Sequence, residues 1–299
     1  MMRFRGDLRR PLAALAALAG IVLAGCGSSA GSGRGAGAHG PVAVLYAASL
    51  ERLMNASIGP AFERATGGRF VGFPGGSDEL ASEIKGGVRR ADVFISASPK
   101  VNAKLEGARN GNWVSWYAPF ASSRLVLGYN PHSRFAAQLR QRPWYRVIAE
   151  PGLRLGFTDP RLDPKGKLAV AALERAARLY REPALMRIAH DPADVFPEQD
   201  LVGRLQSGQL DAGFFYTVEA TASGIPTVPI APIDEQATFT ITIPRGAPDQ
   251  RTAIAFVRFL LGPAGRARLR AGGLAVDRAP AAVGRGVPAT LAGTIKLSR

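Results

Sequence analysis

The sequence predicts an α/β protein built as two lobes, and two observations indicate this fold class. Short apolar segments typical of buried strands alternate with longer segments typical of helices, an order that favours a parallel sheet. This alternation occurs in two blocks, and the last helices return toward the first block. The chain of 299 residues is long enough for two domains, and its 46% hydrophobic and 20% charged residues are globular values.

The first block is expected to contain three strands and two helices. Strands are predicted at residues 42–46, 69–73 and 91–95, and helices at 47–66 and 77–85. The segment Pro74–Gly76 is predicted to form the turn before the second helix. The aromatic stretch 113–123 is expected to be a loop.

The second block repeats the pattern, and the chain then returns to the first. In the second block, strands are predicted at 124–129, 153–157, 211–215 and 227–229, and helices at 163–181 and 200–207. After the return to the first block, a strand is predicted at 239–243 and helices at 251–261 and 264–270. The chain is expected to cross between the lobes near 122–125 and 235–238. The predicted first lobe is therefore 41–121 plus 236–299, and the second lobe is 122–235.

The first forty residues have the pattern of an export signal followed by a tether. Four arginines precede an apolar run of 13 residues that ends on Leu23-Ala-Gly-Cys26. This pattern is typical of a secretory signal, and the run is shorter than the roughly 20 residues of a membrane span. The ending resembles the lipobox of bacterial lipoproteins, which implies that Cys26 carries a lipid. Residues 1–25 are predicted to be a signal peptide and residues 26–40, rich in Gly and Ser, a flexible tether.

Composition and motifs argue against several classes of function. The net charge of +15 comes from scattered arginines, and an exported protein rarely meets nucleic acid, so no nucleic-acid partner is expected. The three histidines lack metal-ligand spacing, and the chain has neither a nucleophile elbow nor a phosphate-binding loop. With its one cysteine assigned to the lipobox, it has no disulfide. We therefore predict no enzymatic activity, no cofactor and no resident metal.

Two serines at predicted strand-to-helix turns are candidate anion ligands. Ser49 and Ser77 would each expose a hydroxyl beside the free N–H groups of a helix start, where the helix dipole also favours negative charge. Either serine could instead cap its own helix. The glycines before Ser77 would let a ligand approach the backbone.

The second block supplies two further candidates. Asp163 is placed as the N-cap of its helix, with Pro164 at the first helical position. Tyr216 ends the strand at 211–215, so its hydroxyl could reach the same edge of the sheet, although ordinary packing would explain it equally well. Open α/β sheets bind ligands at the carboxyl ends of their strands, and these residues follow such ends.

Several stretches occur in an order shared with a known family. They are Ala47–Leu50, Gly76–Ser77, Ala91–Phe94, Trp116–Tyr129, Gly156–Gly166, Leu205–Tyr216 and Phe256–Pro263. In this order they resemble the solute-binding proteins of ABC importers, and among these the molybdate- and tungstate-binding branch. The resemblance implies a two-lobed periplasmic-binding-protein fold of type II, with a ligand cleft between the lobes.

The resemblance also implies which residues hold the ligand. Serine hydroxyls, backbone N–H groups and a tyrosine bind an oxyanion in that family, and the matching residues here are Ser49, Ser77 and Tyr216. In the archaeal tungstate binders two carboxylates also bond the metal centre, and Asp163 matches the first. The second is expected immediately before the tyrosine, where this chain has Phe215. We therefore expect a tetrahedral oxyanion, with Asp163 in the ligand set or acting as a helix cap beside it.

The predicted function is that of a substrate-binding lipoprotein of an ABC importer. It would capture molybdate or tungstate and deliver the anion to a membrane permease, working as a monomer in the periplasm or at the cell surface, held there by the lipid on Cys26. Loss of one serine donor is predicted to weaken binding by about 1–3 kcal/mol. The alternatives are another solute (sulfate, phosphate, an organic molecule or a metal chelate), an enzyme on the same frame, or a surface lipoprotein that binds a partner protein.

Overall fold

A computed structural model describes residues 40–297 of the chain. The predicted signal peptide, the predicted lipid site Cys26 and the tether up to His39 lie outside the described residues. The strands are β1 (Pro41–Ala47), β2 (Arg69–Gly75), β3 (Val93–Ser96), β4 (Trp116–Tyr129), β5 (Leu155–Thr158), β6 (Val195–Phe196), β7 (Ala212–Tyr216), β8 (Thr227–Pro229), β9 (Gln236–Thr242), β10 (Ala275–Val276) and β11 (Val283–Gly284).

Helices connect most of these strands. They are α1 (Glu51–Leu53), α2 (Gly59–Thr66), α3 (Ser77–Lys85), α4 (Pro99–Ala103), α5 (Ala136–Gln141), α6 (Trp144–Val147), α7 (Pro164–Tyr180), α8 (Pro183–Ala189), α9 (Glu198–Gln206), α10 (Thr217–Ser223), α11 (Gln250–Leu261) and α12 (Pro263–Ala271). The predicted helix 47–66 is divided: a 3-10 turn at Ala48–Leu50 precedes α1, and a π-helical turn at Met54–Ile58 joins α1 to α2. Helices α4, α5, α6, α8 and α10 were not predicted from the sequence.

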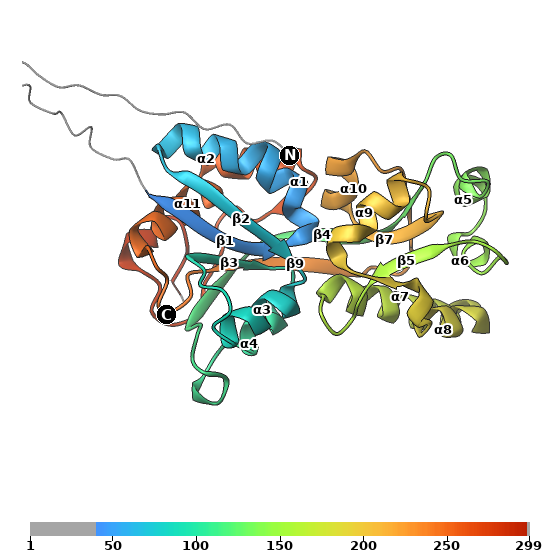
Figure 1. Ribbon diagram of the computed structural model, residues 1–299, viewed down its shortest axis with the longest axis horizontal. Coiled ribbons are helices and arrows are strands. Elements are labelled where there is room, and N and C mark those ends of the chain that lie inside the picture. The colour runs from blue at the N-terminus through green and yellow to red at the C-terminus, as the bar shows by residue number, and fades with distance from the viewer. Residues whose placement is uncertain (1–39, 298–299) are drawn as a thin grey trace, which may run out of the picture. The chain divides into compact units, whose positions relative to one another are not determined.

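The sheet is mixed, not parallel throughout as the sequence suggested. Strand β1 lies between β2 and β3 and pairs with both in parallel, and β5 pairs in parallel with β6 and β7. Strands β4 and β9 run antiparallel to their neighbours, in the order β2-β1-β3-β9-β4-β7-β5-β6. The fold is therefore α/β with two parallel blocks joined through two antiparallel strands, as Figure 1 shows.

The stretch 113–123 corrects the sequence prediction, because residues 116–123 belong to β4 and not to a loop. Side chains from Trp116 to Phe120 alternate between buried and half-buried, which is the period of a strand. Pro119 is accommodated within the strand because the register with β9 shifts between Pro119 and Ala121. An aromatic-rich strand with an irregular register is easily mistaken for a loop.

Strand β4 changes partners along its 14 residues. Residues 116–124 pair with β9, β10 and β11, and residues 125–129 pair with β7 and β8. This change supports a crossing near 124–125, and the backbone N–H of Leu125 donates to the carbonyl of Glu235, 2.8 Å away, at the second expected crossing. We propose the lobe boundaries given above, with 41–121 plus 236–299 as the first lobe and 122–235 as the second.

Each lobe packs helices on both faces of its part of the sheet. In the first lobe α2 and α11 cover one face while α3 and α4 cover the other (Figure 1). In the second lobe, Phe214 packs in the cluster that contains the buried face of α7, and Phe215 packs in the cluster that contains Leu201 and Leu205 of α9. This alternation along β7 fixes which of its side chains can reach each layer.

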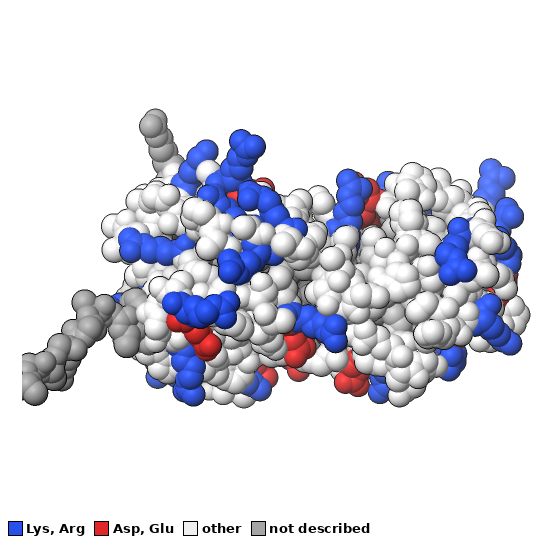
Figure 2. Space-filling model, turned by 90° about the horizontal axis from the view of Figure 1, so that it is seen from above, with Lys and Arg blue, Asp and Glu red and all other residues white. Residues whose placement is uncertain are grey.

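Basic side chains on the face shown in Figure 2 do not gather in one patch. Figure 2 shows Lys and Arg scattered over both lobes on the face in view, with fewer Asp and Glu between them. This distribution is that of a solvated surface, as the scattered arginines of the sequence indicated. Among residues 40–297, no helix is both long enough and apolar enough to span a membrane.

Candidate functional site

Five parallel strands end at one seam between the lobes, and a polar residue follows or closes each of them. Ser49 follows β1, Ser77 follows β2, Asp163 follows β5, Glu198 follows β6, and Tyr216 ends β7. All five side chains are buried. The carboxyl ends of parallel strands are where open α/β sheets bind ligands.

Ser49 lies in the 3-10 turn after β1 and connects the two lobes. Its backbone N–H donates to Oε1 of Glu198 on α9 at 3.0 Å. Its side chain does not cap a helix, and its Oγ is buried without a hydrogen-bond partner in the described part of the chain. The helix-cap explanation for this serine is therefore wrong.

Ser77 is the first residue of α3, and Gly76 occupies the N-cap position. The Ser77 Oγ accepts a hydrogen bond from the backbone N–H of Ala97 at 3.0 Å, so the hydroxyl is fixed within the first lobe while its proton remains available to a further acceptor. The side chain is fully buried. Ser77 therefore has a structural role, which Ser49 lacks.

A backbone segment of the second lobe lies directly against the start of α3. The backbone N–H groups of Asp78 and Glu79 both donate to the carbonyl of Leu162 at 3.1 Å. A Cβ atom on Gly76 would lie 2.5 Å from that carbonyl oxygen, so only glycine fits there. The same Cβ would lie 3.5 Å from the Cβ of Asp163, which brings the turn before Ser77 next to that carboxylate. The turn at Gly76, where a ligand was expected to approach the backbone, is therefore occupied by the backbone of the opposite lobe.

Asp163 occupies the N-cap of α7, with Pro164 at the first helical position as the sequence predicted. Its Oδ2 accepts a hydrogen bond from Thr158 Oγ1 at 2.6 Å, whereas its buried Oδ1 has no partner among residues 40–297. Burial raises the pKa of this carboxyl, and the nearby Lys165 ammonium opposes that rise.

Tyr216 is fully buried at the end of β7, with its ring edge-on to Phe239 at a centroid distance of 6.0 Å. Its hydroxyl has no hydrogen-bond partner within the described chain. Burial raises the pKa of the phenol, and the negative charges of Asp163 and Glu198 raise it further, so the hydroxyl stays protonated and can donate. An unpartnered buried hydroxyl is more than ordinary packing requires.

Sequence reasoning missed Glu198, and this omission corrects the ligand set. The expected second carboxylate was sought at position 215, where the chain has Phe215, and that ring is buried on the α9 side of β7. Glu198, the first residue of α9, supplies a carboxylate instead: Oε1 accepts from Ser49 N–H, and the buried Oε2 has no partner in the described residues. Burial and the Asp163 charge raise the pKa of Glu198 well above its usual value. A glutamate after Pro197 at a strand end was the available signal.

Two further charged residues that the sequence did not single out, Lys165 and Glu219, lie beside Glu198. Lys165, in the first turn of α7, is fully buried, and its Nζ donates to both carboxylate oxygens of Glu219 at 2.9 and 2.7 Å. Its Nζ also lies 3.6 Å from Glu198 Oε1. The carboxylates of Glu219 and Glu198 raise the pKa of Lys165 against the opposing effect of burial, so the lysine is charged. The Asp163-Pro-Lys-Gly166 motif held this lysine, but it was assigned only to a helix start.

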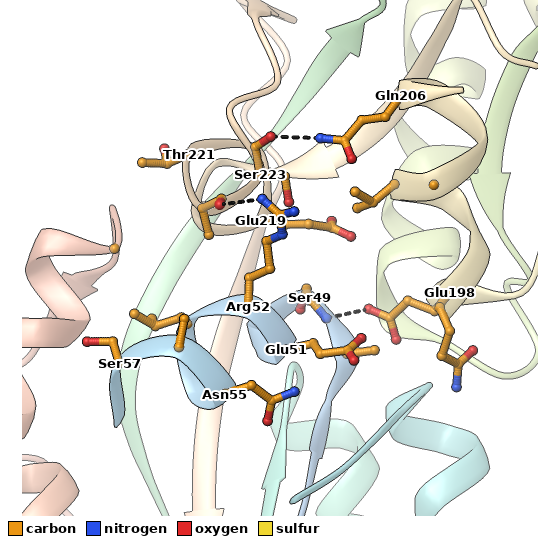
Figure 3. A pocket seen from close by; sticks show the side chains of 18 of the residues that line it. Ser49, Glu51, Arg52, Asn55, Ser57, Glu198, Gln206, Glu219, Thr221 and Ser223 are labelled. Atoms are coloured by element: carbon orange, nitrogen blue, oxygen red, sulfur yellow. Dashed lines mark hydrogen bonds between the residues drawn. The ribbon is translucent and has the colours of Figure 1, made fainter. Parts of the chain in front are cut away.

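The polar cluster lies between two cavities. One, of about 830 Å³, is lined by Ser49, Glu198 and Glu219 together with Arg52 and polar residues of α10 (Figure 3). The other, of about 850 Å³, lies on the Asp163 side and is also lined by Glu198. Glu198 and its neighbour Gln199 line both cavities, and the buried cluster separates them.

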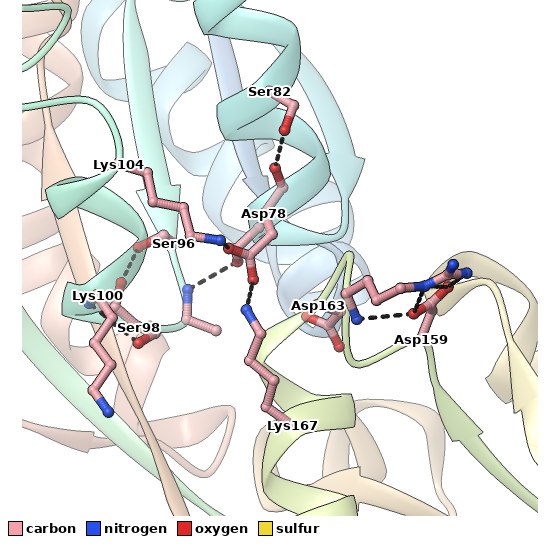
Figure 4. A network of polar contacts seen from close by, with 12 residues as sticks. Asp78, Ser82, Ser96, Ser98, Lys100, Lys104, Asp159, Asp163 and Lys167 are labelled. Carbon is pink, nitrogen blue, oxygen red and sulfur yellow. Dashed lines mark hydrogen bonds and ion pairs between the residues drawn. The ribbon is translucent and has the colours of Figure 1, made fainter. Parts of the chain in front are cut away.

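Ionic and polar contacts also join the lobes at the edge of the seam. Buried Asp78 of α3 pairs with Lys104 of its own lobe at 2.5 Å and with Lys167 of α7 in the second lobe, as Figure 4 shows. On another edge Arg52 donates from Nη1 to the carbonyl of Ala222 at 3.3 Å. These contacts hold the lobes together around the cluster.

The carboxylates and histidines of the described chain do not form a cation site. Among residues 40–297 no group of three or more His, Cys, Asp or Glu side chains is placed to hold a metal ion. The exposed His190 lies 3.1 Å from Glu174 and lines the cavity on the Asp163 side. The chemistry of the seam is hydrogen bonding from buried hydroxyls beside a lysine and three carboxylates.

Residues 42–275 match the family of bacterial extracellular solute-binding proteins. The chain belongs to this family. Membership confirms the solute-binding class and places the protein outside the cytoplasm. A Haloferax volcanii protein provisionally named as an ABC transporter molybdenum-binding protein is 31% identical over 215 residues, which cover 71% of this chain and 67% of that one.

Two other comparisons agree with this family. The molybdate/tungstate-binding protein WtpA of Thermococcus kodakarensis is 22% identical over 60% of this chain and 64% of its own length. The solved structure of the periplasmic molybdate-binding protein of Azotobacter vinelandii superposes with a TM-score of 0.61 at 21% identity, covering 79% of this chain and 99% of that protein. This structural likeness confirms the two-lobed periplasmic-binding-protein fold of the solute-binding protein described here.

Proposed function

We propose that this solute-binding protein captures a tetrahedral oxyanion, with molybdate or tungstate as its preferred ligand, and delivers it to the permease of an ABC importer. One observation carries the proposal: four buried polar atoms at the seam have no hydrogen-bond partner among residues 40–297. They are the hydroxyls of Ser49 and Tyr216 and one carboxylate oxygen each of Asp163 and Glu198. Buried polar groups in native proteins are rarely left without partners, so such a cluster indicates a polar guest.

The hydroxyls provide the donors that a dehydrated anion needs. Ser49 contributes from the first lobe and Tyr216 from the second, and Ser77 retains a proton that it can donate. Charge-assisted hydrogen bonds from such fixed donors replace the hydration that a dianion loses on burial. Because the donors come from both lobes, binding favours the closed arrangement of the two lobes.

The carboxylates favour a molybdenum or tungsten oxyanion over sulfate or phosphate. A dianion is repelled by Asp163 and Glu198 if both are charged, so each must either hold a proton or bond to an electron-poor centre in the guest. Molybdenum(VI) and tungsten(VI) accept additional oxygen ligands, whereas the sulfur of sulfate and the phosphorus of phosphate do not. The tetrahedral geometry inferred from Phe215 rested on the lack of a second carboxylate. With Glu198 present, both carboxylates are available as ligands, so an anion that is tetrahedral in solution can expand its coordination when it is bound.

The names of relatives support the same ligand class. The Haloferax relative is named for molybdenum and the Thermococcus relative for molybdate and tungstate. The Azotobacter structure is named for molybdate, but its likeness bears on the fold alone. We also propose that the protein acts as a monomer, that Cys26 carries a lipid, and that the tether keeps it near its permease at raised effective concentration. Binding and release are its whole activity, without a catalytic step.

Titration calorimetry of the purified full chain tests the proposal. Molybdate, tungstate, sulfate and phosphate are each titrated, together with a ferric chelate as a solute of another class. We expect tight binding of molybdate or tungstate and binding of sulfate and phosphate at least about 100-fold weaker. Tighter binding of sulfate or phosphate, or binding of the chelate alone, would contradict the assignment. Glu182→Gln, which neutralises a partly exposed glutamate that lines neither cavity, is a suitable control for the loss of one negative charge.

A further inference from the structure

We infer that Lys165 is a positioning residue that determines the strength of oxyanion binding by orienting and electrically balancing Glu198, while Glu219 only restrains the lysine. This inference rests on the proposed function and names a specificity device within the same site. Its basis is the geometry of three side chains, from α7, α9 and α10, that meet in the interior.

Lys165 is the one lysine or arginine that is buried among residues 40–297, and it is fully buried. Burial of a charged ammonium is unfavourable unless carboxylates and hydrogen bonds compensate it. Glu219 supplies the hydrogen-bonded part of that compensation, because both of its oxygens accept from Nζ at 2.9 and 2.7 Å, and the charges of Glu198 and Asp163 add to it. Nζ also lies 3.6 Å from Glu198 Oε1, and this second contact is not required by the hydrogen bonds between Lys165 and Glu219.

Lys165 and the first lobe act on the same oxygen atom of Glu198. Oε1 accepts the Ser49 N–H at 3.0 Å and faces the Lys165 ammonium, so this oxygen is held from both sides. Oε2 is the oxygen without a partner in the described chain. Fixing one oxygen leaves the other in a defined direction, which is what a ligand atom needs.

The aromatic side chains around Lys165 restrict where its ammonium can go. Nζ lies 5.7 Å from the ring centroid of Phe215 and 5.9 Å from that of Tyr216. The two rings lie on either side of β7, so the ammonium stays at the edge of that strand, beside the Tyr216 hydroxyl and Glu198. Phe215, which takes the position where a second carboxylate was expected, thus becomes part of the packing around the lysine.

The two members of the ion pair have unequal effects on a bound dianion. Three carboxylates, those of Asp163, Glu198 and Glu219, share this interior with a single ammonium. Removing the lysine leaves the guest facing carboxylates alone, whereas neutralising Glu219 leaves the ammonium in place and removes one negative charge. If the ion pair were purely structural, loss of Lys165 and neutralisation of Glu219 would weaken oxyanion binding equally. Unequal effects on binding are therefore the test of the inference.

The test uses the full chain and the three variants Lys165→Met, Glu219→Gln and the double variant. Tungstate and molybdate affinities are measured by calorimetry, and the stability of each ligand-free protein is measured by urea unfolding. The Glu219→Gln change keeps a side-chain oxygen that accepts from Nζ, so that variant preserves the restraint on the lysine. Lys100→Met, which removes an exposed lysine of α4, is the matched control for loss of one positive charge.

We expect Lys165→Met to weaken tungstate binding by at least about 30-fold and Glu219→Gln to leave it within about 3-fold of the wild type or tighter. The double variant is expected to recover part of the stability that Lys165→Met loses, because Glu219 is then no longer an unpaired buried charge, but it is not expected to recover the affinity. Should Lys165→Met alone fail to fold, the double variant still decides the question.

Two outcomes would overturn the inference. One is a double variant that binds tungstate within about 3-fold of the wild type, and the other is a Glu219→Gln variant as weak as Lys165→Met. Either result would make the pair structural only. Failure of the proposed function is distinguishable, since then the wild-type protein itself would bind neither tungstate nor molybdate.

Discussion

The two lobes contribute different chemistry to the seam between them. The first lobe presents neutral hydroxyls, Ser49 and Ser77, on turns that follow β1 and β2. The second lobe presents an ionic cluster of Asp163, Lys165, Glu198 and Glu219, together with the neutral hydroxyl of Tyr216. Hydroxyls are equally suited to many oxyanions, whereas a balanced cluster of carboxylates and an ammonium suits few. Under the proposed function, the first lobe supplies hydroxyl donors that suit oxyanions in general, and the ionic cluster of the second lobe determines the selectivity among them.

The largest effect is expected from Glu198→Gln in the second lobe. The substituted amide retains an oxygen for the Ser49 N–H but loses the carboxylate whose Oε2 is unpartnered in the described structure. Tungstate affinity should fall by about 2–3 kcal/mol, roughly 30- to 150-fold, while sulfate affinity stays the same or rises because one negative charge is removed. Calorimetry with both anions measures the ratio, and an unchanged ratio would assign selectivity elsewhere.

A smaller effect is expected from the serines of the first lobe, and the two should differ. Ser49→Ala should weaken every oxyanion by about 1–3 kcal/mol with little change in stability, because Ser49 Oγ has no partner in the described chain. Ser77→Ala should in addition lower the free energy of unfolding by about 1–3 kcal/mol, since the buried Ala97 N–H loses its acceptor. Calorimetry and urea unfolding separate the two, and a Ser49→Ala variant with full affinity would remove Ser49 from the site.

The contact between the lobes offers a matched pair of lysines. Both Lys167 and Lys104 pair with Asp78, but only Lys167 comes from the second lobe. Lys167→Met should therefore speed ligand release by a few-fold, about 1 kcal/mol or less, because both lysines are about half exposed and their pairs are screened by solvent. Lys104→Met should leave release unchanged. Stopped-flow release rates at low and high salt test this, and equal effects would show that the pairs do not hold the lobes closed.

The smallest effect concerns Asp194, which lies in the 3-10 turn before β6. Burial and the charge of Asp191 raise the pKa of Asp194 to about 6. The folded state therefore binds this proton more tightly than the unfolded state, so the contribution to stability is present below about pH 4 and is lost as the pH rises through about 6. Asp194→Asn should flatten the pH dependence of unfolding in that window, by less than about 1 kcal/mol after solvent screening. Urea unfolding from pH 4 to 7 measures it.

Local sequence patterns predicted most of the fold. They failed where a segment departs from the regular spacing of apolar residues that marks a strand or a helix. Helix α3 was predicted with its observed bounds because a Gly-Gly turn and an amphipathic run mark both ends. Strand β4 was missed over residues 116–123 because Pro119 and aromatic residues interrupt the usual signals. The mixed direction of the sheet was missed because the antiparallel placement of β4 and β9 depends on crossing between lobes, and no local pattern encodes that crossing.

The sequence by itself determined the α/β class, the positions of Ser49, Ser77, Asp163 and Tyr216 at strand ends, and the export pattern of the first residues, because strand and helix periods, caps and signals are short-range properties. Only the tertiary structure decided that Glu198, Lys165 and Glu219 join them, since these side chains lie on three different helices and meet through packing between layers. It also decided that Leu162, from the opposite lobe, occupies the N–H groups at the start of α3. Charge balance in a buried site depends on neighbours distant in the chain, and for that reason folding was needed to reveal it.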